Sequence, residues 1–225
     1  MTIQTPPIHI LYENSDWLPP LTEALALQGF DDVNLIELSD GIINSNTVPA
    51  EGIWINRISP SSHTRGHLQT VQLAREVLFW LEFHDRRVIN GTKAFEIEMS
   101  KFRQDLILRK YGIETPKTIL AVGRNQLLSA AEEFDGPFLT KHNQGGKGLG
   151  IQLFQSVAGL QEYLDGGSFD EGPDGKVILQ EYISPSRNVI TRVELVGGRF
   201  LFAMHSSTEN GFQLCPSEAC QLQAA

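Results

Sequence analysis

One short stretch of the chain, residues 138–150 (FLTKHNQGGKGLG), combines the residue types that bind anions. Residues 138–142 predict a short strand that carries one inward lysine, Lys141. A loop rich in glycine and carrying a second lysine follows: Gln144, Gly145, Gly146, Lys147, Gly148 and Gly150. Glycines let backbone N–H groups approach a ligand and point in one direction, and a lysine adds positive charge. The stretch suggests a lid over a polyphosphate, unless its glycines only form turns. It is not a GxxxxGK[ST] phosphate loop, because glycine follows the second lysine.

Three further basic residues stand where an anion could bind. Lys101 falls in the first turn of a predicted helix, where the helix dipole disfavours a cation. An anionic ligand would explain this lysine, and so would simple exposure to solvent. Arg57 and Arg65 lie in a loop after a predicted strand, at the sheet edge where open α/β sheets bind ligands. They could hold a carboxylate or phosphate; the alternative is a solvated loop with a helix cap.

Strands alternate with helices over residues 1–92, which predicts a small parallel α/β sheet. The expected strands are 8–12, 33–38, 52–55 and 87–89, and the expected helices are about 21–28, after a stop at Pro19 and Pro20, and 67–84. No GxGxxG follows the first strand, so dinucleotide binding is not expected there.

A second unit is expected from Lys93 onward. Its predicted helices are 101–111, 126–134 capped by Asn125, and 157–164 capped by Ser156. Its predicted strands are 118–122, 138–142, 150–154 and 176–183, followed by a hairpin of 189–196 and 199–205 around Gly197 and Gly198. Apolar residues alternate along the hairpin and no helical pattern follows to cover them, so we expect either a homodimer or an aggregation-prone monomer.

Composition narrows the class of protein. The chain has 225 residues and a net charge of −9 without a basic cluster, which argues against nucleic acid or an anionic membrane as the main partner. It contains no apolar run of ~18 residues and no signal-peptide pattern, so no membrane association and a cytoplasmic location are expected. Cys215 and Cys220 have no Cys or His partners at ligand spacing. Free thiols are favoured over a disulfide or a metal site.

Together these parts resemble the nucleotide-binding half of the ATP-grasp superfamily. The resemblance rests on Lys101, on Lys141 forty residues later, on the glycine loop and on the strand VILQEYI. The phrases SKFRQDLILRKYGIETPKT, TKHNQGGKGLG and QEYI are most similar to RimK-like glutamate ligases and their glutathione-synthetase-like relatives. The implied fold class is α/β, with α+β character in the second unit. Residues 1–92 would be the pre-ATP-grasp domain, and 93–225 an incomplete ATP-grasp nucleotide-binding domain, truncated in its second subdomain after about residue 205.

The resemblance also implies site residues. Contacts to ATP would come from Lys101, Lys141, Gln144, Gly145, Gly146, Lys147, Gly148, Gly150, Gln180, Glu181, Tyr182 and Ile183. The two matching lysines would contact phosphates, the loop would cover the β- and γ-phosphates, and residues 180–183 would hold the adenine edge through Glu181 and the backbone. Arg192 would act in catalysis near substrate or phosphate, and Arg57 and Arg65 would contact substrate. Where relatives carry an acidic residue, two positions before Arg192, this chain has Ile190.

The implied chemistry is ATP-dependent joining of a carboxylate, small-molecule or peptide, to an amine through an acyl phosphate. The Asp, Glu and Asn that would bind Mg²⁺ lie downstream of the hinge strand in this family, and Glu194, Glu209 and Glu218 cannot be matched to them. We therefore expect a fragment or natural truncation that binds ATP, is inactive alone, and needs a further C-terminal portion to bind Mg²⁺. Three alternatives stay open: a non-catalytic ATP-binding module, a small-molecule kinase, and an α/β protein whose glycine loop binds nothing.

Overall fold

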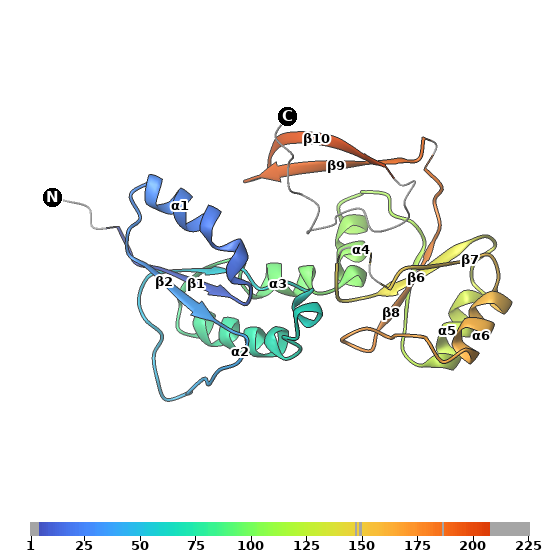
Figure 1. The fold of residues 1–225 in the computed structure, drawn as a ribbon, viewed down its shortest axis with the longest axis horizontal. Helices are drawn as coiled ribbons and strands as arrows, with labels where there is room; N and C mark the ends of the chain where they lie inside the picture. Colours follow the sequence, from blue (N-terminus) through green and yellow to red (C-terminus); the bar gives the residue numbers. More distant parts are fainter. Residues whose placement is uncertain (1–4, 147, 149, 186, 208–225) are drawn as a thin grey trace. The chain divides into compact units, whose positions relative to one another are not determined.

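A computed structural model describes residues 5–146, 148, 150–185 and 187–207. The chain divides into two compact units, Met1–Ser100 and Lys101–Ala225 (Figure 1). The sequence-based boundary stood at residue 92, so a short helix that follows it belongs to the first unit in the structure. Cys215 and Cys220 lie outside the described residues.

The first unit is a parallel sheet with helices on both faces. Its strands are β1 (Ile8–Tyr12), β2 (Val33–Glu37), β3 (Ile53–Asn56) and β4 (Arg87–Ile89), in the order β2-β1-β3-β4. Its α-helices are α1 (Pro19–Leu27), α2 (Thr70–Phe83) and α3 (Thr92–Glu98), and its 3-10 helices are η1 (Ser15–Trp17) and η2 (Ser62–Arg65). The predicted parallel α/β fold is confirmed.

Alternation along β1 builds the two halves of this core, because neighbouring side chains on a strand point to opposite faces. Ile10 is fully buried in a cluster with residues of α1, whereas its neighbour Leu11 is fully buried in a cluster with α2 and α3. Figure 1 shows α1 on one side of the sheet and α2 on the other. The unit therefore has three layers.

Two details of the first unit differ from the sequence-based expectation. Pro19 and Pro20 do not precede α1 but form its first turn, where proline is tolerated because the first N–H groups of a helix have no intrahelical partner. Helix α3 was not expected. It is only seven residues long, too short for a periodic signal, but it buries Phe95 completely.

The second unit is built around an antiparallel sheet. Its strands are β5 (Thr118–Ala121), β6 (Phe138–His142), β7 (Gln152–Phe154) and β8 (Val177–Glu181), in the order β5-β8-β6-β7. Its helices are α4 (Lys101–Lys110), α5 (Arg124–Ala131) and α6 (Val157–Asp165), and a separate hairpin consists of β9 (Val189–Val196) and β10 (Arg199–Ser207). The sequence anticipated each of these elements within a few residues.

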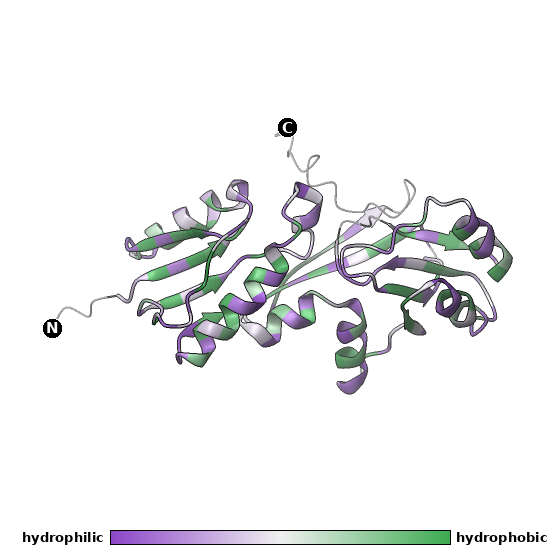
Figure 2. Ribbon diagram, turned by 90° about the horizontal axis from the view of Figure 1, so that it is seen from below, coloured by the Kyte–Doolittle hydropathy of each residue, from purple (hydrophilic) through white to green (hydrophobic). Residues whose placement is uncertain are grey.

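Helices α5 and α6 cover one face of this sheet. Apolar residues of both helices pack in one cluster with Phe138 of β6 and with Val177 and Leu179 of β8. Apolar and polar positions alternate around the helices (Figure 2). The Ser156 cap of α6 is confirmed, since its side chain accepts a hydrogen bond from the Gly159 amide. The Asn125 cap is wrong. Helix α5 begins at Arg124, before Asn125, and its N-cap is Gly123.

The hairpin follows the sequence prediction closely. Gly197 and Gly198 form its turn with φ of 56° and 76°, a conformation that glycine adopts without strain. Several large apolar side chains of both strands are exposed: Val193, Leu195, Val196, Phe200, Leu201, Phe202 and Met204. The hairpin is thus a patch of apolar surface in the structure.

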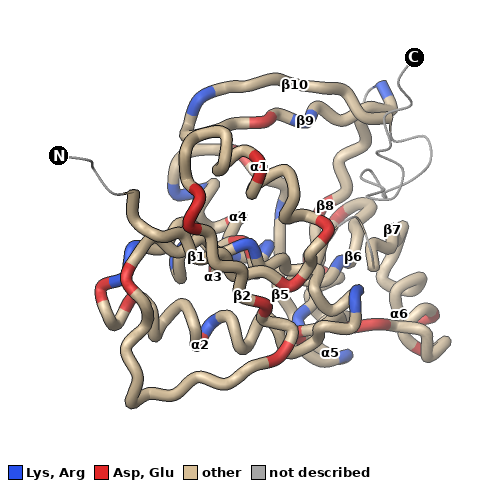
Figure 3. Tube along the Cα trace, turned by 60° about the vertical axis from the view of Figure 1, so that its left-hand side comes forward, with Lys and Arg blue, Asp and Glu red and all other residues tan. Residues whose placement is uncertain are grey.

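Basic and acidic positions are interspersed along the described part of the chain (Figure 3). No helix among the described residues is both long enough and apolar enough to span a bilayer.

Candidate functional site

A polar row crosses the sheet of the second unit on the face opposite α5 and α6. Because Phe138 packs under α5 and α6, alternation places Lys141 of β6 on the opposite face. There the Lys141 ammonium donates to the Gln180 side-chain oxygen of β8 at 2.6 Å, and the Gln180 amide donates to the Thr118 hydroxyl of β5 at 2.8 Å. The three side chains fix one another, so Lys141 is held in one orientation.

Lys101, the first residue of α4, meets the end of β6. Its ammonium donates to the carbonyl oxygens of Asn143 at 3.3 Å and Gly145 at 2.9 Å. The Asn143 side chain accepts from the backbone N–H of Phe102 and donates to a carboxylate oxygen of Asp174 at 2.8 Å. Asn143 therefore ties the start of α4 to the segment just after β6.

The charge of Lys141 acts on Lys101. The pKa of Lys101 is lowered to about 8, first by burial and second by the charge of Lys141, while Asp174 acts in the opposite direction. Burial also lowers the pKa of Lys141, against the charge of Asp105. Asp105 itself pairs with Arg109 at 2.9 Å. Among the described residues, neither lysine has a carboxylate within ion-pair distance, because uncharged oxygens hold both head groups. Two adjacent, partly buried cations in this state attract an anion.

The glycine loop follows β6 directly and begins beside the two lysines. The backbone angle φ is positive at Gly145 (131°), Gly148 (75°) and Gly150 (72°). Residues other than glycine rarely adopt this conformation. Gln144 is buried, and the Gly145 carbonyl is held by Lys101. Lys147, which the sequence nominated with these glycines, lies outside the described residues. The described part of the loop thus has, near both of its ends, backbone conformations that favour glycine.

The end of the predicted hinge strand is hydrogen-bonded to neighbouring segments of the second unit. The Glu181 carboxylate accepts from the Lys117 backbone N–H at 3.2 Å, and the Glu181 N–H donates to the Lys117 carbonyl. The Tyr182 N–H donates to the Pro137 carbonyl at 3.0 Å. These groups hold β8 in the sheet. Within the described part of the chain, the N–H of the exposed residue Ile183 has no partner and can meet a ligand.

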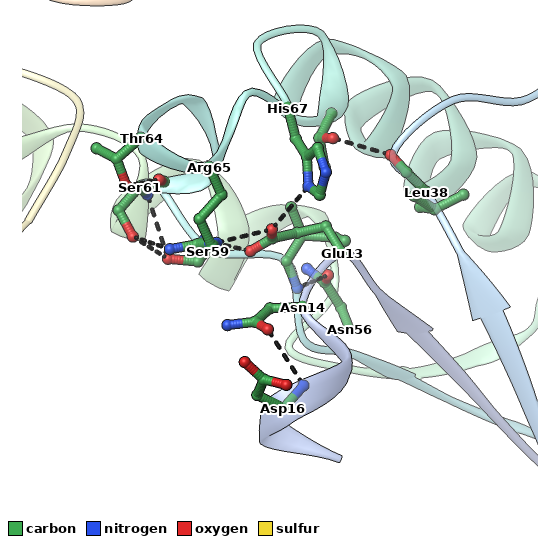
Figure 4. Close-up of polar contacts among 12 residues, drawn as sticks. Glu13, Asn14, Asp16, Leu38, Asn56, Ser59, Ser61, Thr64, Arg65 and His67 are labelled. Atoms are coloured by element: carbon green, nitrogen blue, oxygen red, sulfur yellow. Dashed lines mark hydrogen bonds and ion pairs between the residues drawn. The ribbon is translucent and has the colours of Figure 1, made fainter. Parts of the chain in front are cut away.

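Arg65 belongs to a separate polar cluster in the first unit, at the carboxyl ends of β1 and β3 (Figure 4). The chain leaves β1 toward β2 on one side and returns to β3 on the other, which makes this edge the switch point of the sheet. Glu13 follows β1 and has a fully buried carboxylate, and Arg65 donates to both of its oxygens. The His67 ring contacts the same carboxylate at 3.2 Å. The charge of Arg65 is therefore already compensated within the protein.

Arg57 and Arg192 occupy exposed positions. The Arg57 backbone N–H donates to the Leu11 carbonyl, which places Arg57 at the same sheet edge. Its charge partly offsets the rise in the pKa of Glu98 that burial causes, so the guanidinium lies near α3. Arg192 is on β9 and pairs with Glu194 of the same strand at 2.5 Å. The structure thus unites Lys101, Lys141, Gly145 and Gln180 within the second unit, whereas Arg57 belongs to the first unit and Arg192 to the β9–β10 hairpin.

The residues that position these side chains were missed at the sequence level. Asn143 and Asp174 support Lys101, and Glu13 compensates Arg65. Asn143 stands next to the glycine loop and could have been suspected from that position. Asp174 and Glu13 are far from their partners in the sequence, and only the fold brings them together. Among the described residues, no group of three or more His, Cys, Asp or Glu side chains could hold a metal ion.

Comparison with known proteins agrees with this geometry. The model of the RimK-like ATP-grasp domain matches residues 99–214. The tetrahydromethanopterin:alpha-L-glutamate ligase of Methanococcus maripaludis is 27% identical over 125 residues, which cover 55% of this chain and 42% of that protein. A probable alpha-L-glutamate ligase of Pasteurella multocida is 25% identical over 146 residues, covering 64% of this chain and 45% of that protein. The chain spans less than half the length of these two relatives.

Solved structures share the fold. A D-cycloserine synthetase superposes with a TM-score of 0.65 at 21% identity, covering 93% of this chain and 70% of the other. A RimK domain ATP-grasp protein from Sphaerobacter thermophilus superposes with a TM-score of 0.59 at 15% identity, covering 83% and 68%. At these identities the likeness concerns architecture. The expected arrangement of a parallel α/β unit followed by an antiparallel one is therefore found in proteins of known structure.

Proposed function

The chain belongs to the RimK-like ATP-grasp family, and we propose from this membership that it binds ATP at the lysine pair as part of an ATP-dependent carboxylate-amine ligase. The observation that carries the proposal is the pairing of Lys101 and Lys141. Both are partly buried, both are hydrogen-bonded to uncharged oxygens, and the carboxylates of Asp174 and Asp105 offset the lowering of their pKa only in part. A polyphosphate supplies the missing negative charge.

The remaining contacts follow from where these lysines lie. The backbone of the glycine loop from Gln144 to Gly150 would face the outer phosphates, as its positive-φ glycines allow. The exposed N–H of Ile183 would meet the adenine edge, while Glu181 and the Tyr182 amide keep their roles in the sheet. We thus propose fewer protein groups in contact with the adenine edge than the family resemblance implied.

In the proposed reaction the γ-phosphoryl group passes from ATP to a substrate carboxylate, and ADP leaves. The amine of the second substrate then attacks the acyl carbon, an amide forms and inorganic phosphate departs. Lys101 and Lys141 would offset the charge on the phosphates, and the loop would keep water from the acyl phosphate. The described residues offer no carboxylate set for Mg²⁺, so we assign its ligands to none of them and route no step through the metal.

The substrate is proposed to be a small-molecule or peptide carboxylate. Relatives include ligases named for attaching glutamate, which has both a carboxylate and an amine to offer. Arg57 is the better candidate of the two first-unit arginines for an anionic substrate, because Arg65 is already paired with Glu13. Arg192 remains a proposed catalytic residue near substrate or phosphate, which requires that it exchange Glu194 for a ligand.

Thermal unfolding of the chain with a non-hydrolysable ATP analogue, with and without Mg²⁺, tests the proposal. Ligand at about 100 times its dissociation constant stabilises the folded state by about 2.7 kcal/mol, which raises the unfolding midpoint measurably. No change of the midpoint at millimolar analogue would contradict the proposal. With ATP and candidate substrates, amide plus released phosphate identifies a ligase, a phosphate ester identifies a kinase, and binding without turnover identifies a non-catalytic module.

The exposed hairpin supports a further proposal, that two copies of the chain associate through β9 and β10. The strands carry exposed apolar side chains such as Leu195 and Phe200, 61% and 66% accessible, and burial of such surface favours association. We expect size-exclusion chromatography with light scattering to give twice the monomer mass. The variant Leu195→Lys with Phe200→Lys should shift the mass to that of a monomer. A monomer for the unaltered chain at high concentration would be the contrary result.

A further inference from the structure

His142, the last residue of β6, lies directly behind the lysine pair. It follows Lys141, so alternation puts its ring on the sheet face that α5 and α6 cover. The side chain is 9% exposed, although the residue is polar, and the sequence analysis assigned it no role. A buried ring next to a functional lysine needs a structural explanation.

Two glycines enclose the ring. A Cβ added at Gly150 would lie 2.5 Å from the imidazole Nε2, and one added at Gly172 would lie 2.6 Å from its Cγ. Side-chain carbons do not approach other atoms this closely, so both positions require glycine for space as well as for their φ of +72° and +78°. Gly150 ends the glycine loop, and Gly172 lies in the segment between α6 and β8. The ring of His142 therefore packs against both segments.

Polar contacts fix the same junction. The His142 Nε2 hydrogen-bonds to the backbone carbonyl of Asp170 at 3.0 Å. The next residue, Asn143, donates its backbone N–H to the Lys176 carbonyl at 3.0 Å and its side-chain amide to Asp174. The segment between α6 and β8 is thus attached to the end of β6 at several points.

We propose that His142 is a positioning residue of the anion site: its ring, held between Gly150 and Gly172, sets the end of β6 and so the places of Lys141 and of the Asn143 carbonyl that holds Lys101. This inference rests on the proposed ATP site and adds a remote determinant to it. A substitution at Gly172, which lies outside the glycine loop, should then change the positions of the two lysines.

The structure provides a matched pair of substitutions to test this role. Gly172→Ala pushes the new methyl group into the His142 ring. Gly167→Ala, in the same segment and at nearly the same φ (+72°), meets nothing within 4 Å. Both carry the strain of alanine at positive φ, so their difference reports the contact with His142. We expect Gly172→Ala to weaken binding of the ATP analogue about tenfold, the loss of one charge-assisted hydrogen bond, and Gly167→Ala to leave it unchanged.

A double-mutant cycle separates this effect from general destabilisation. In a His142→Ala background the ring is gone, so Gly172→Ala should add little further loss of affinity. The pH at which analogue affinity falls should also move upward from about 8 in Gly172→Ala, because separating the lysines weakens their repulsion; a purely structural defect would leave that pH in place. Should Gly172→Ala not fold, His142→Asn, which removes the ring, takes its place with the same expected loss and shift.

The outcomes are distinguishable. If the unaltered chain binds no analogue, the proposed ATP site is overturned and this role of His142 with it. If it binds, and Gly172→Ala or its replacement His142→Asn matches Gly167→Ala in affinity and pH profile, only the positioning role is overturned. A tenfold loss confined to the variants that disturb the ring, with non-additivity in the cycle, supports it.

Discussion

Replacing Lys141 by methionine should weaken binding of a non-hydrolysable ATP analogue about 100-fold. The ammonium group is partly buried, fixed by Gln180, and without a carboxylate partner among the described residues, so it is preorganised for an anion. Hydrogen bonds to charged groups contribute about 1.5–3 kcal/mol each, and a phosphate can accept more than one. Methionine preserves much of the side-chain volume and removes the charge. Isothermal titration calorimetry measures the change directly.

Lys110→Met is the matched control, because Lys110 lies on α4 with Lys101 but in its exposed last turn. It removes the same formal charge from the same unit and should leave affinity within about twofold, since exposed charges are screened. Equal affinity losses in the two variants would mean that net charge alone attracts the nucleotide. An unaffected Lys141→Met variant would remove the lysine pair from the site.

Analogue affinity should also fall about tenfold between pH 7 and pH 9. The pKa of Lys101 is lowered to about 8 by burial and by Lys141. About nine-tenths of the free protein therefore carries the Lys101 charge at pH 7 and about one-tenth at pH 9. If the charged form binds, a proton is taken up on binding in this range. Calorimetry in buffers of different ionisation enthalpy measures that uptake.

The lowered pKa of Lys101 also makes stability depend on pH. Affinity should fall as the pH rises, whereas the free energy of unfolding should rise. Because Lys101 has a pKa near 10.5 when unfolded and about 8 when folded, the unfolded chain binds more protons between these values. The free energy of unfolding contributed by this group therefore rises with pH from about 8 to 10.5. Lys101→Arg keeps its charge throughout, so both the affinity profile and this contribution should become flat. An unchanged profile in Lys101→Arg would assign the titration to another group.

Much of this protein follows from its sequence because the signals are local. The strand over residues 138–142 and the turn glycines at Gly197 and Gly198 are indicated by only a few neighbouring residues, and both predicted elements are confirmed. The order of Lys101, Lys141, the glycine loop and the strand of residues 177–183 was also sufficient to indicate the family that the comparison then supported.

Where local signals were ambiguous, the sequence reading failed for definable reasons. Two prolines before a helical pattern look the same whether they stop the chain or begin the helix, and only the backbone of α1 shows the second case. A seven-residue helix such as α3 has too few turns to reveal a period, and its stability comes from burying Phe95 against the first unit's core.

What only the tertiary structure decided is which charges remain uncompensated. In the sequence Arg65 and Lys101 are equally plausible anion ligands. In the fold Arg65 meets the buried carboxylate of Glu13, 52 residues away, whereas Lys101 meets the carbonyl groups of Asn143 and Gly145 beside a second lysine. Electrostatic interaction falls off with distance in space and not along the chain. The sequence therefore identified the residue types that could bind an anion. Which of these residues are positioned to bind one depends on the packing of segments that are distant in the sequence.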